Sequence, residues 1–292
     1  MTKKKIYLLM ICSCLFWAGA FIAGKYTVPY ISTFTLTFLR FFYAVIILYV
    51  VMKRTKVDFA LEKSRIPVFL VTGTVGMFGY HVLFFTALKY TTAINSSIIA
   101  ATNPMVTTLL AVIFLKNKLR TKQLLGILLS FTGVLLTITG ADIEILRSFS
   151  FNAGDLWMLA AVTAWAVYGV FSKSKGKDIQ PIVLTYYSFL VCTILLIPFV
   201  IYEKPWEFLF TVPVSAHMAV LYMSIFPSVI GYLVQQMAIK EIGPSKASIF
   251  VNLVPVFSII LAVALLGEDP EPIKLLTAAL IILGVLICQR SQ

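Results

Sequence analysis

The sequence contains few acidic residues, histidines and cysteines, and each scarcity excludes a class of site. Its 292 residues include only 12 Asp and Glu, two His and four Cys. Every acidic residue falls in a predicted loop or at the end of an apolar run, so no buried carboxylate pair is available for acid–base catalysis. The cysteines, Cys12, Cys14, Cys192 and Cys288, show neither a pairing pattern nor metal-ligand spacing. We therefore predict no metal site, no cofactor and no enzymatic activity.

Long runs of apolar residues, in contrast, are abundant. About 60% of the residues are hydrophobic and 12% are charged, whereas soluble domains have roughly half and a quarter. A bilayer-spanning helix needs about 20 mostly apolar residues. We predict ten such spans, over residues 6–24, 34–52, 66–88, 94–115, 122–139, 154–172, 182–202, 215–239, 246–266 and 273–289. The chain is thus predicted to be an all-α integral membrane protein, because lipid cannot hydrogen-bond an open backbone.

The basic residues are distributed unevenly between the two sides of these spans. Eighteen of the 24 Lys and Arg fall in loops or ends on the side of the N-terminus, five fall on the opposite side, and the last is Arg40. This bias places both termini in the cytoplasm. The net charge of +12 therefore indicates topology and attraction to anionic lipid, and it does not indicate nucleic-acid binding. Residues 1–24 could also be read as a signal peptide, but cleavage there would spoil the even number of spans.

The two halves of the chain resemble each other. "FWAGAFIAGK" (16–25) aligns with "AWAVYGVFSK" (164–173) at an offset of 148 residues, and from the third span onward the offset is 151. We predict two repeats, residues 1–140 and 154–290, with five spans each. Because five is odd, the second repeat must be inverted in the membrane. Inverted repeats are typical of secondary transporters, in which a central site faces the two sides alternately.

Two prolines lie inside apolar runs at corresponding positions of the repeats. Pro104 and Pro255 are 151 residues apart. A proline within a span frees a carbonyl group and breaks or bends the helix. Interrupted helices at matching positions indicate a binding site near the membrane midplane. A packing kink without a ligand nearby is the alternative.

These features resemble the drug/metabolite transporter superfamily, in its EamA-type ten-span branch. The resemblance is carried by the tryptophan in the first helix of each repeat, by "ALKYTTA" (87–93) and "AIKEIGPSKAS" (238–248), and by "LLGE" (265–268). The first half departs from the pattern, since "LKNK" (115–118) replaces "LGED" (266–269). The resemblance implies transport but leaves the substrate open. Relatives include exporters of amino acids and other metabolites, and carriers of sugar phosphates and nucleotide sugars.

Positions at which the repeats differ, together with aromatic faces of the predicted helices, are candidates for substrate contacts. For example, His81 aligns with Tyr232, and Arg40 aligns with Ser188. Side chains three or four residues apart share one helix face. The predicted substrate-binding residues are Trp17, Arg40, Tyr80, His81, Phe84, Asn103, Trp165, Tyr168, Tyr232, Gln235, Gln236 and Asn252.

Several of these residues have a structural alternative. His81 is either the only plausible buried proton carrier or a structural hydrogen-bond donor. Arg40 either faces a cavity or extends its side chain outward to the membrane surface, and Gln235 and Gln236 either contact substrate or bond across helices. The lack of buried carboxylates favours a neutral, zwitterionic or carboxylate-bearing substrate. A cation would have to rely on cation–π contacts.

We predict a secondary transporter of small amphipathic metabolites such as amino acids in the cytoplasmic membrane, with export as the favoured direction. Drug or quaternary-ammonium efflux is the alternative within the same class. A membrane-embedded lipid enzyme is a remote alternative, because the sequence offers no catalytic constellation. Spans 1, 3, 4, 6, 8 and 9 should surround the cavity, and spans 5 and 10 should form a scaffold or a homodimer face.

Overall fold

The computed structural model describes residues 3–58, 60–115, 120–148, 150–176, 178–242 and 250–289. Within these ranges the chain forms helices and turns but no strand, as an all-α protein should. Eight helical stretches of the described chain are long and apolar enough to cross a membrane, and Leu253–Leu266 and Pro272–Cys288 are shorter apolar helices. The prediction of a membrane-embedded helical protein is therefore supported, while the count of ten spans stays a prediction.

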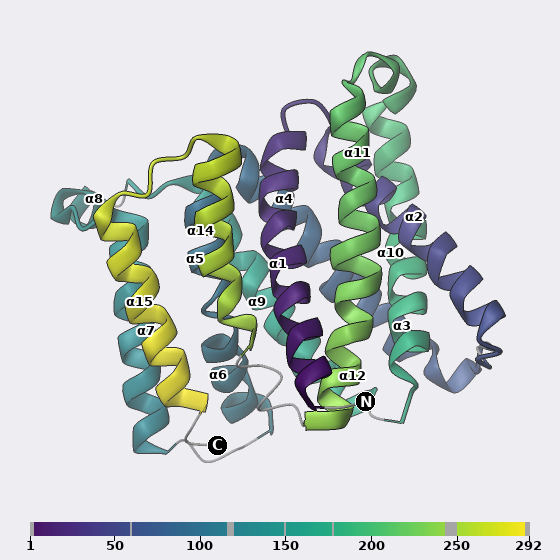
Figure 1. The fold of residues 1–292 in the computed structure, drawn as a ribbon, viewed down its shortest axis with the longest axis horizontal. Helices are drawn as coiled ribbons and strands as arrows, with labels where there is room; N and C mark the ends of the chain where they lie inside the picture. Colours follow the sequence, from purple (N-terminus) through teal and green to yellow (C-terminus); the bar gives the residue numbers. More distant parts are fainter. Residues whose placement is uncertain are drawn as a thin grey trace.

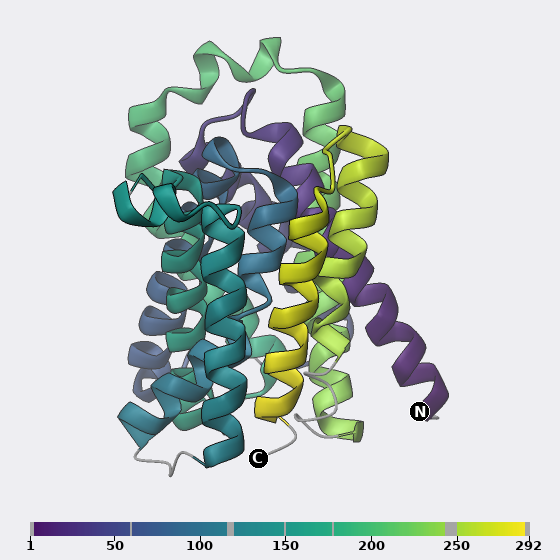
Figure 2. The same ribbon diagram turned by 90° about the vertical axis from the view of Figure 1, so that its left-hand side faces the viewer.

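The helices form one bundle (Figures 1 and 2). Its first half consists of α1 (Lys3–Thr27), α2 (Thr33–Arg54), η1 (Lys63–Arg65), α3 (Ile66–Val71), η2 (Thr72–Gly79), α4 (Tyr80–Tyr90), α5 (Ala93–Ala100), α6 (Asn103–Leu115) and α7 (Thr121–Thr139). A short helix, α8 (Ile143–Ser148), leads to the second half. That half consists of α9 (Ala153–Lys175), α10 (Pro181–Glu203), η3 (Pro205–Glu207), η4 (Leu209–Thr211), α11 (Val214–Met223), η5 (Ser224–Gly231), α12 (Tyr232–Ile242), α14 (Leu253–Leu266) and α15 (Pro272–Gln289). The start of α1 and the end of α15 lie at the same end of the bundle (Figure 1).

Two segments of the bundle are π-helical, namely η2 between α3 and α4 and η5 between α11 and α12. Each is eight residues long, and each interrupts an otherwise α-helical stretch. In a π-helix the backbone bonds are displaced by one residue, which widens the turn and is often found at functional sites. Apolar periodicity does not predict such turns, since the composition of the segment still reads as a span.

The two prolines noted above lie at the beginning of new helical segments. Pro104 is the second residue of α6, which follows a turn at Ala101 and Thr102, and Pro255 is the third residue of α14, which follows a turn at Asn252. Proline is tolerated in the first helical turn because its missing N–H would have no intrahelical partner there. Each proline thus lies where a helix is interrupted by a turn, and not at a bend within a continuous helix. The preceding part of the ninth predicted span, residues 246–249, lies outside the described residues.

Helices α7 and α15 pack against each other along one edge of the bundle (Figure 1). Glycines allow the close approach: a Cβ added at Gly284 would lie 2.6 Å from the carbonyl oxygen of Gly126 and 2.7 Å from the backbone nitrogen of Ser130. The Ser130 hydroxyl also donates a hydrogen bond to the Ile281 carbonyl, at 3.2 Å. The outer faces of both helices expose leucines, among them Leu128 and Leu276. The pair packs along one side of the bundle, and its roles as a scaffold or as a homodimer face stay predictions.

Candidate functional site

A cavity of about 140 Å³ lies among the broken helices. It is lined by residues from α1, α4, α5, α6, α9, α12 and α14, together with Arg40 of α2. Ten of the twelve predicted binding residues line it: Trp17, Arg40, Tyr80, His81, Phe84, Asn103, Trp165, Tyr232, Gln235 and Asn252. Both prolines, Pro104 and Pro255, line it as well. The structure therefore brings these residues together, while their contact with a substrate stays a prediction.

Two predicted residues are not part of this wall. Tyr168 does not line the cavity. Its ring packs on Trp165, with ring centroids 4.9 Å apart, and covers Gly76 of η2, where a Cβ would collide with it. Helical spacing placed Tyr168 on the face of Trp165, but the π-helical turn opposite offers a glycine that accepts the tyrosine ring. The side chain of Gln236 lies outside the described residues.

The cavity wall also includes small residues that are not among the predicted binding residues. Ser97, Ala100 and Ala101 contribute from α5 and the turn after it, and Val254 contributes from α14. Small apolar side chains carry no chemical signal in a membrane protein, because they are equally common at plain helix contacts. Ser97 aligns with Ser248 in the other repeat, so a search for differences between the repeats passes over it.

Arg40 is buried on α2, with 4% of its surface exposed. Its Nε donates a hydrogen bond to the Ser228 hydroxyl of η5 at 2.9 Å. The guanidinium carbon lies 5.7 Å from the centre of the Phe41 ring and 5.9 Å from that of Phe85. No Asp or Glu in the described part of the chain forms an ion pair with it. The side chain therefore does not extend to the membrane surface; it brings a positive charge to the cavity.

His81 makes a structural hydrogen bond and also lines the cavity, while its role as a proton carrier stays a prediction. The ring lines the cavity and is 2% exposed. Its Nδ1 lies 2.9 Å from the carbonyl oxygen of Met77 in η2. Because a carbonyl only accepts, Nδ1 carries the hydrogen, and in the neutral ring Nε2 is left as an acceptor. His81 thus fastens η2 to α4 while presenting its ring beside Tyr80 and Trp165, which it meets edge to face.

Replacing His81 with tyrosine is expected to permit insertion and folding, because the aligned position in the other repeat is Tyr232 and both rings line the same cavity. We expect a several-fold weaker apparent affinity for substrate, since the imidazole acceptor is lost. Exchange rates recorded from about pH 5 to 7.5, where histidine titrates, separate the two roles. A proton carrier loses its pH dependence in His81→Tyr, and a contact residue keeps it. Unchanged affinity, rate and pH profile would contradict both.

Trp17 is held against η5. Its indole Nε1 donates to the carbonyl oxygen of Pro227 at 3.2 Å, and a Cβ at Gly231 would lie 2.7 Å from the same nitrogen. The indole thus bonds a backbone carbonyl of the π-helical segment η5. The Nε1 edge of the Trp17 indole is thus bonded to η5, and the residue also lines the cavity. In the other half of the chain, Tyr168 covers Gly76 of η2 in a similar way.

Asn252, at the turn before α14, presents an unused hydrogen-bond donor. The residue is 7% exposed and lines the cavity. Its Nδ2 is buried without a hydrogen-bond partner in the described parts of the chain. Asn103 is different, because its Oδ1 accepts a bond from the Thr107 hydroxyl at 3.3 Å. A buried amide N–H without a partner is costly, which favours a ligand or water at Asn252.

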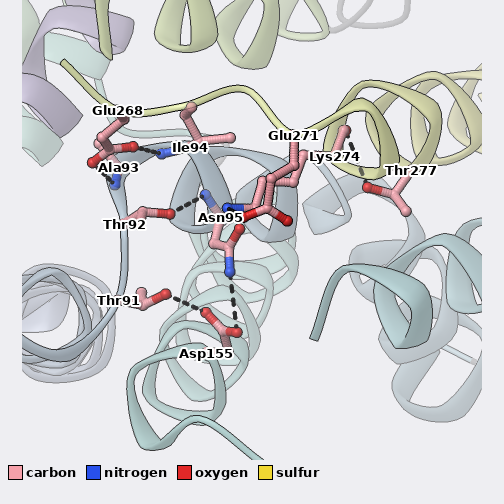
Figure 3. A network of polar contacts seen from close by, with 10 residues as sticks. All are labelled: Thr91, Thr92, Ala93, Ile94, Asn95, Asp155, Glu268, Glu271, Lys274 and Thr277. Atoms are coloured by element: carbon pink, nitrogen blue, oxygen red, sulfur yellow. Dashed lines mark hydrogen bonds and ion pairs between the residues drawn. The ribbon is translucent and has the colours of Figure 1, made fainter. Parts of the chain in front are cut away.

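A polar network ties the helices together at the end of the bundle remote from Lys3 (Figure 3). Asp155, in the first turn of α9, accepts a hydrogen bond from the Thr91 hydroxyl at 2.6 Å and one from Asn95 Nδ2 at 3.3 Å. Glu268, after α14, accepts from the backbone N–H groups of Ala93 and Ile94 at 2.8 and 3.0 Å, and so caps α5 (Figure 3). A carboxylate at a helix N-terminus satisfies free N–H groups and complements the helix dipole.

Lys25 adds a second connection at this end. Its Nζ donates to the carbonyl oxygens of Leu88 and Thr91, at 2.8 and 2.7 Å, which joins the end of α1 to the end of α4. The sequence placed Asp155 and Glu268 correctly at span ends. Their partners, however, lie 60 or more residues away in the chain, so only the packed structure identifies them.

Comparison with known proteins identifies the family. The EamA-like transporter family matches residues 4–139 and 152–289. The protein belongs to this family. This EamA-like transporter is 36% identical over 290 residues to the uncharacterized transporter YyaM of Bacillus subtilis, covering 98% of this chain and 94% of the other. The resemblance noted in the sequence is thereby confirmed: the protein is a membrane-embedded transporter.

Two further comparisons concern the substrate and the fold. A protein of Streptantibioticus cattleyicolor named as a probable terminal-alkyne amino-acid exporter is 26% identical over 226 residues, which cover 77% of this EamA-like transporter and 73% of that chain. A solved crystal structure covers 98% of both chains with a TM-score of 0.67 and 20% sequence identity. At that identity the likeness shows the fold alone.

Proposed function

We propose that the protein is a secondary transporter that moves small amphipathic metabolites such as amino acids across the cytoplasmic membrane, with export as the favoured direction. The observation that carries the proposal is the cavity, in which aromatic rings, amides and one guanidinium meet beside two broken helices. Such irregular backbone within a membrane protein is tolerated where it lines a cavity. The relative named as a probable amino-acid exporter supports the same class of substrate.

Ten spans in two inverted repeats, residues 1–140 and 154–290, complete the proposal. The π-helical segments η2 and η5 begin 152 residues apart, close to the 151-residue offset of the repeats. Helix α2 packs against η5, and α10 packs against η2. The family also matches two segments of the chain. Each observation relates one half of the chain to the other, as two copies of one unit would.

Alternating access requires that one end of the cavity closes while the other opens. The network of Glu268, Asp155 and Lys25 lies at the end remote from Lys3 and joins α1, α4, α5, α9 and the segment after α14. These contacts would close that end, and their loss would accompany opening toward it. With both termini in the cytoplasm, as the charge bias predicts, this is the outer end.

Drug or quaternary-ammonium efflux is the second candidate. A cationic drug would need a carboxylate or several free aromatic faces. The cavity has the aromatic faces of Trp17, Tyr80 and Trp165, but no Asp or Glu is among its lining residues in the described chain. Arg40 would repel the cation. This candidate therefore ranks below metabolite transport.

Purified protein in liposomes tests the proposal. Liposomes loaded with an unlabelled amino acid or related metabolite are diluted into the radiolabelled compound, and counterflow is followed. We expect saturable exchange of one chemical class, without ATP. An unsaturable, pore-like leak would contradict a carrier. Chemical conversion of the compound would favour the enzyme alternative.

Reporter tags test the inverted arrangement. Tags inserted at Asp58 and at Gly176 should both report the cytoplasm, and a tag at Leu146 should report the exterior, because basic loops remain inside. The measurement is a pair of reporters active on opposite sides of the membrane, inserted at each position. Finding Asp58 and Gly176 on opposite sides would contradict inverted repeats.

A further inference from the structure

Arg40 is a buried charge that has no counter-ion among the described residues. Its Nε is committed to Ser228, but its two terminal nitrogens have no hydrogen-bond partner among the described residues. The rings of Phe41 and Phe85 near the guanidinium carbon supply weak cation–π attraction only. A buried ion is normally paired and hydrogen-bonded, since desolvation is costly. The missing partner of Arg40 must therefore come from something that enters the cavity.

Packing alone does not call for an arginine here. The aligned residue in the other repeat is Ser188, whose hydroxyl lies 2.7 Å from that of Thr72 in η2. Arg40 makes the matching contact to η5 through Ser228. A short hydroxyl therefore suffices for the helix contact in one half. In the other half, the guanidinium adds charge and donors that the contact does not use.

Asn252 supplies a second and independent indication. Asn252 lines the same cavity, and its Nδ2 is a buried donor that has no partner in the described chain. The cavity thus offers unused N–H donors from α2 and from the turn before α14. It offers no carboxylate of its own within the described residues. Donors of this kind, with one positive charge, match a singly charged oxyanion.

We propose that the cavity recognises its substrate by a carboxylate group, held by the terminal nitrogens of Arg40 and by Nδ2 of Asn252. This inference deepens the proposed transport function and rests on it. A guanidinium binds a carboxylate through two parallel hydrogen bonds, a geometry that a lysine does not reproduce. One guanidinium balances one negative charge, so a monocarboxylate fits better than a phosphate ester. The rings of Trp17, Phe84 and Trp165 enclose the apolar part of the substrate.

Matched compounds with one apolar body test the inference. Leucine, 4-methylpentanoate, leucinamide and 3-methylbutylamine share the same branched chain, and phenylalanine, 3-phenylpropanoate, phenylalaninamide and phenethylamine form a second series. Binding is measured by the thermal shift of the purified full-length protein, and exchange is measured by counterflow in liposomes. In at least one series, we expect the compounds that carry a carboxylate to bind at least about tenfold more tightly than those that lack it.

Variants at two positions, Arg40 and Asn252, assign the preference to these residues. Arg40→Gln should abolish the preference for carboxylates, and Arg40→Lys should restore only part of it. Asn252→Asp keeps the size of the side chain and replaces the amide donor with an acid in the wall of the same cavity, so it should fold and also lose carboxylate binding. Gln235→Glu serves as a matched control, because it adds a carboxylate to the same cavity wall without removing either of the proposed donors. It should retain a larger share of the preference than Asn252→Asp.

The outcomes separate this inference from the proposed function. Equal binding of acids and amides by the wild-type protein would overturn the inference and leave transport intact. Retention of the preference in both Arg40→Gln and Asn252→Asp would overturn the assignment to these residues. Carboxylate binding without exchange in liposomes would overturn the proposed function alone. Neither binding nor exchange of any compound in the two series would overturn both.

Discussion

Replacing Gly284 with leucine is expected to disrupt the packing of α7 against α15 and to lower the stability of the protein by about 3 kcal/mol or more. The first added carbon would lie 2.6 Å from the Gly126 carbonyl oxygen and 2.7 Å from the Ser130 nitrogen. Both are backbone atoms, so the helices must separate to make room. Lipid tails are as apolar as leucine side chains, so the hydrophobic effect does not hold two helices together within a membrane. Their association depends on close packing of this kind.

The measurement is the thermal unfolding midpoint of the purified protein in detergent, together with its yield from membranes. Gly169→Leu is the matched control, since an added Cβ at this helical glycine of α9 meets no described atom within 4 Å apart from its chain neighbours and its own helix backbone. Leucine also favours helix more than glycine does. We expect Gly169→Leu to unfold near the wild-type midpoint and Gly284→Leu to unfold well below it. Equal midpoints would mean that α7 and α15 are not held by this contact.

Replacing Glu268 with alanine is expected to lower the transport rate about tenfold or more and to expose the cavity at the end remote from Lys3. The carboxylate caps α5 through the N–H groups of Ala93 and Ile94, so it joins the segment after α14 to the fourth predicted span. Losing it leaves two N–H groups without partners, which costs about 1–3 kcal/mol each when they are buried. This free-energy cost destabilises the conformation in which α5 and the segment after α14 are in contact.

Transport is measured by counterflow, and exposure by a membrane-impermeant maleimide that labels Ala101→Cys in a background without the four native cysteines. Ala101 lines the cavity and is 9% exposed. Labelling from the outer side should rise in Glu268→Ala. Glu271→Ala is the control: this carboxylate lies in the same loop, is half-exposed and pairs with Lys274 at 3.1 Å, its one ion pair among the described residues. Equal labelling in the two variants would show that Glu268 does not hold that end closed.

The sequence by itself determined the class of the protein and most of the cavity wall. The length of the apolar runs and the distribution of Lys and Arg are local properties, and they identify a helical membrane protein without knowledge of its packing. The 151-residue offset located Pro104 and Pro255, and differences between the repeats selected His81 and Asn252, which the structure places along one cavity. Comparison of two copies within one chain supplied this information.

Only the tertiary structure decided what each side chain contacts. Helical periodicity places Trp165 and Tyr168 on one face, but the Tyr168 ring packs over Gly76 of η2 and is not part of the cavity wall. Similarly, nothing local to Arg40 distinguishes a side chain that reaches the surface from one that bonds Ser228, 188 residues away. The unused donor of Asn252 and the partners of Glu268 also depend on which helices meet. Apolar composition directs a segment into the membrane, whereas backbone breaks and side-chain shape determine its neighbours there.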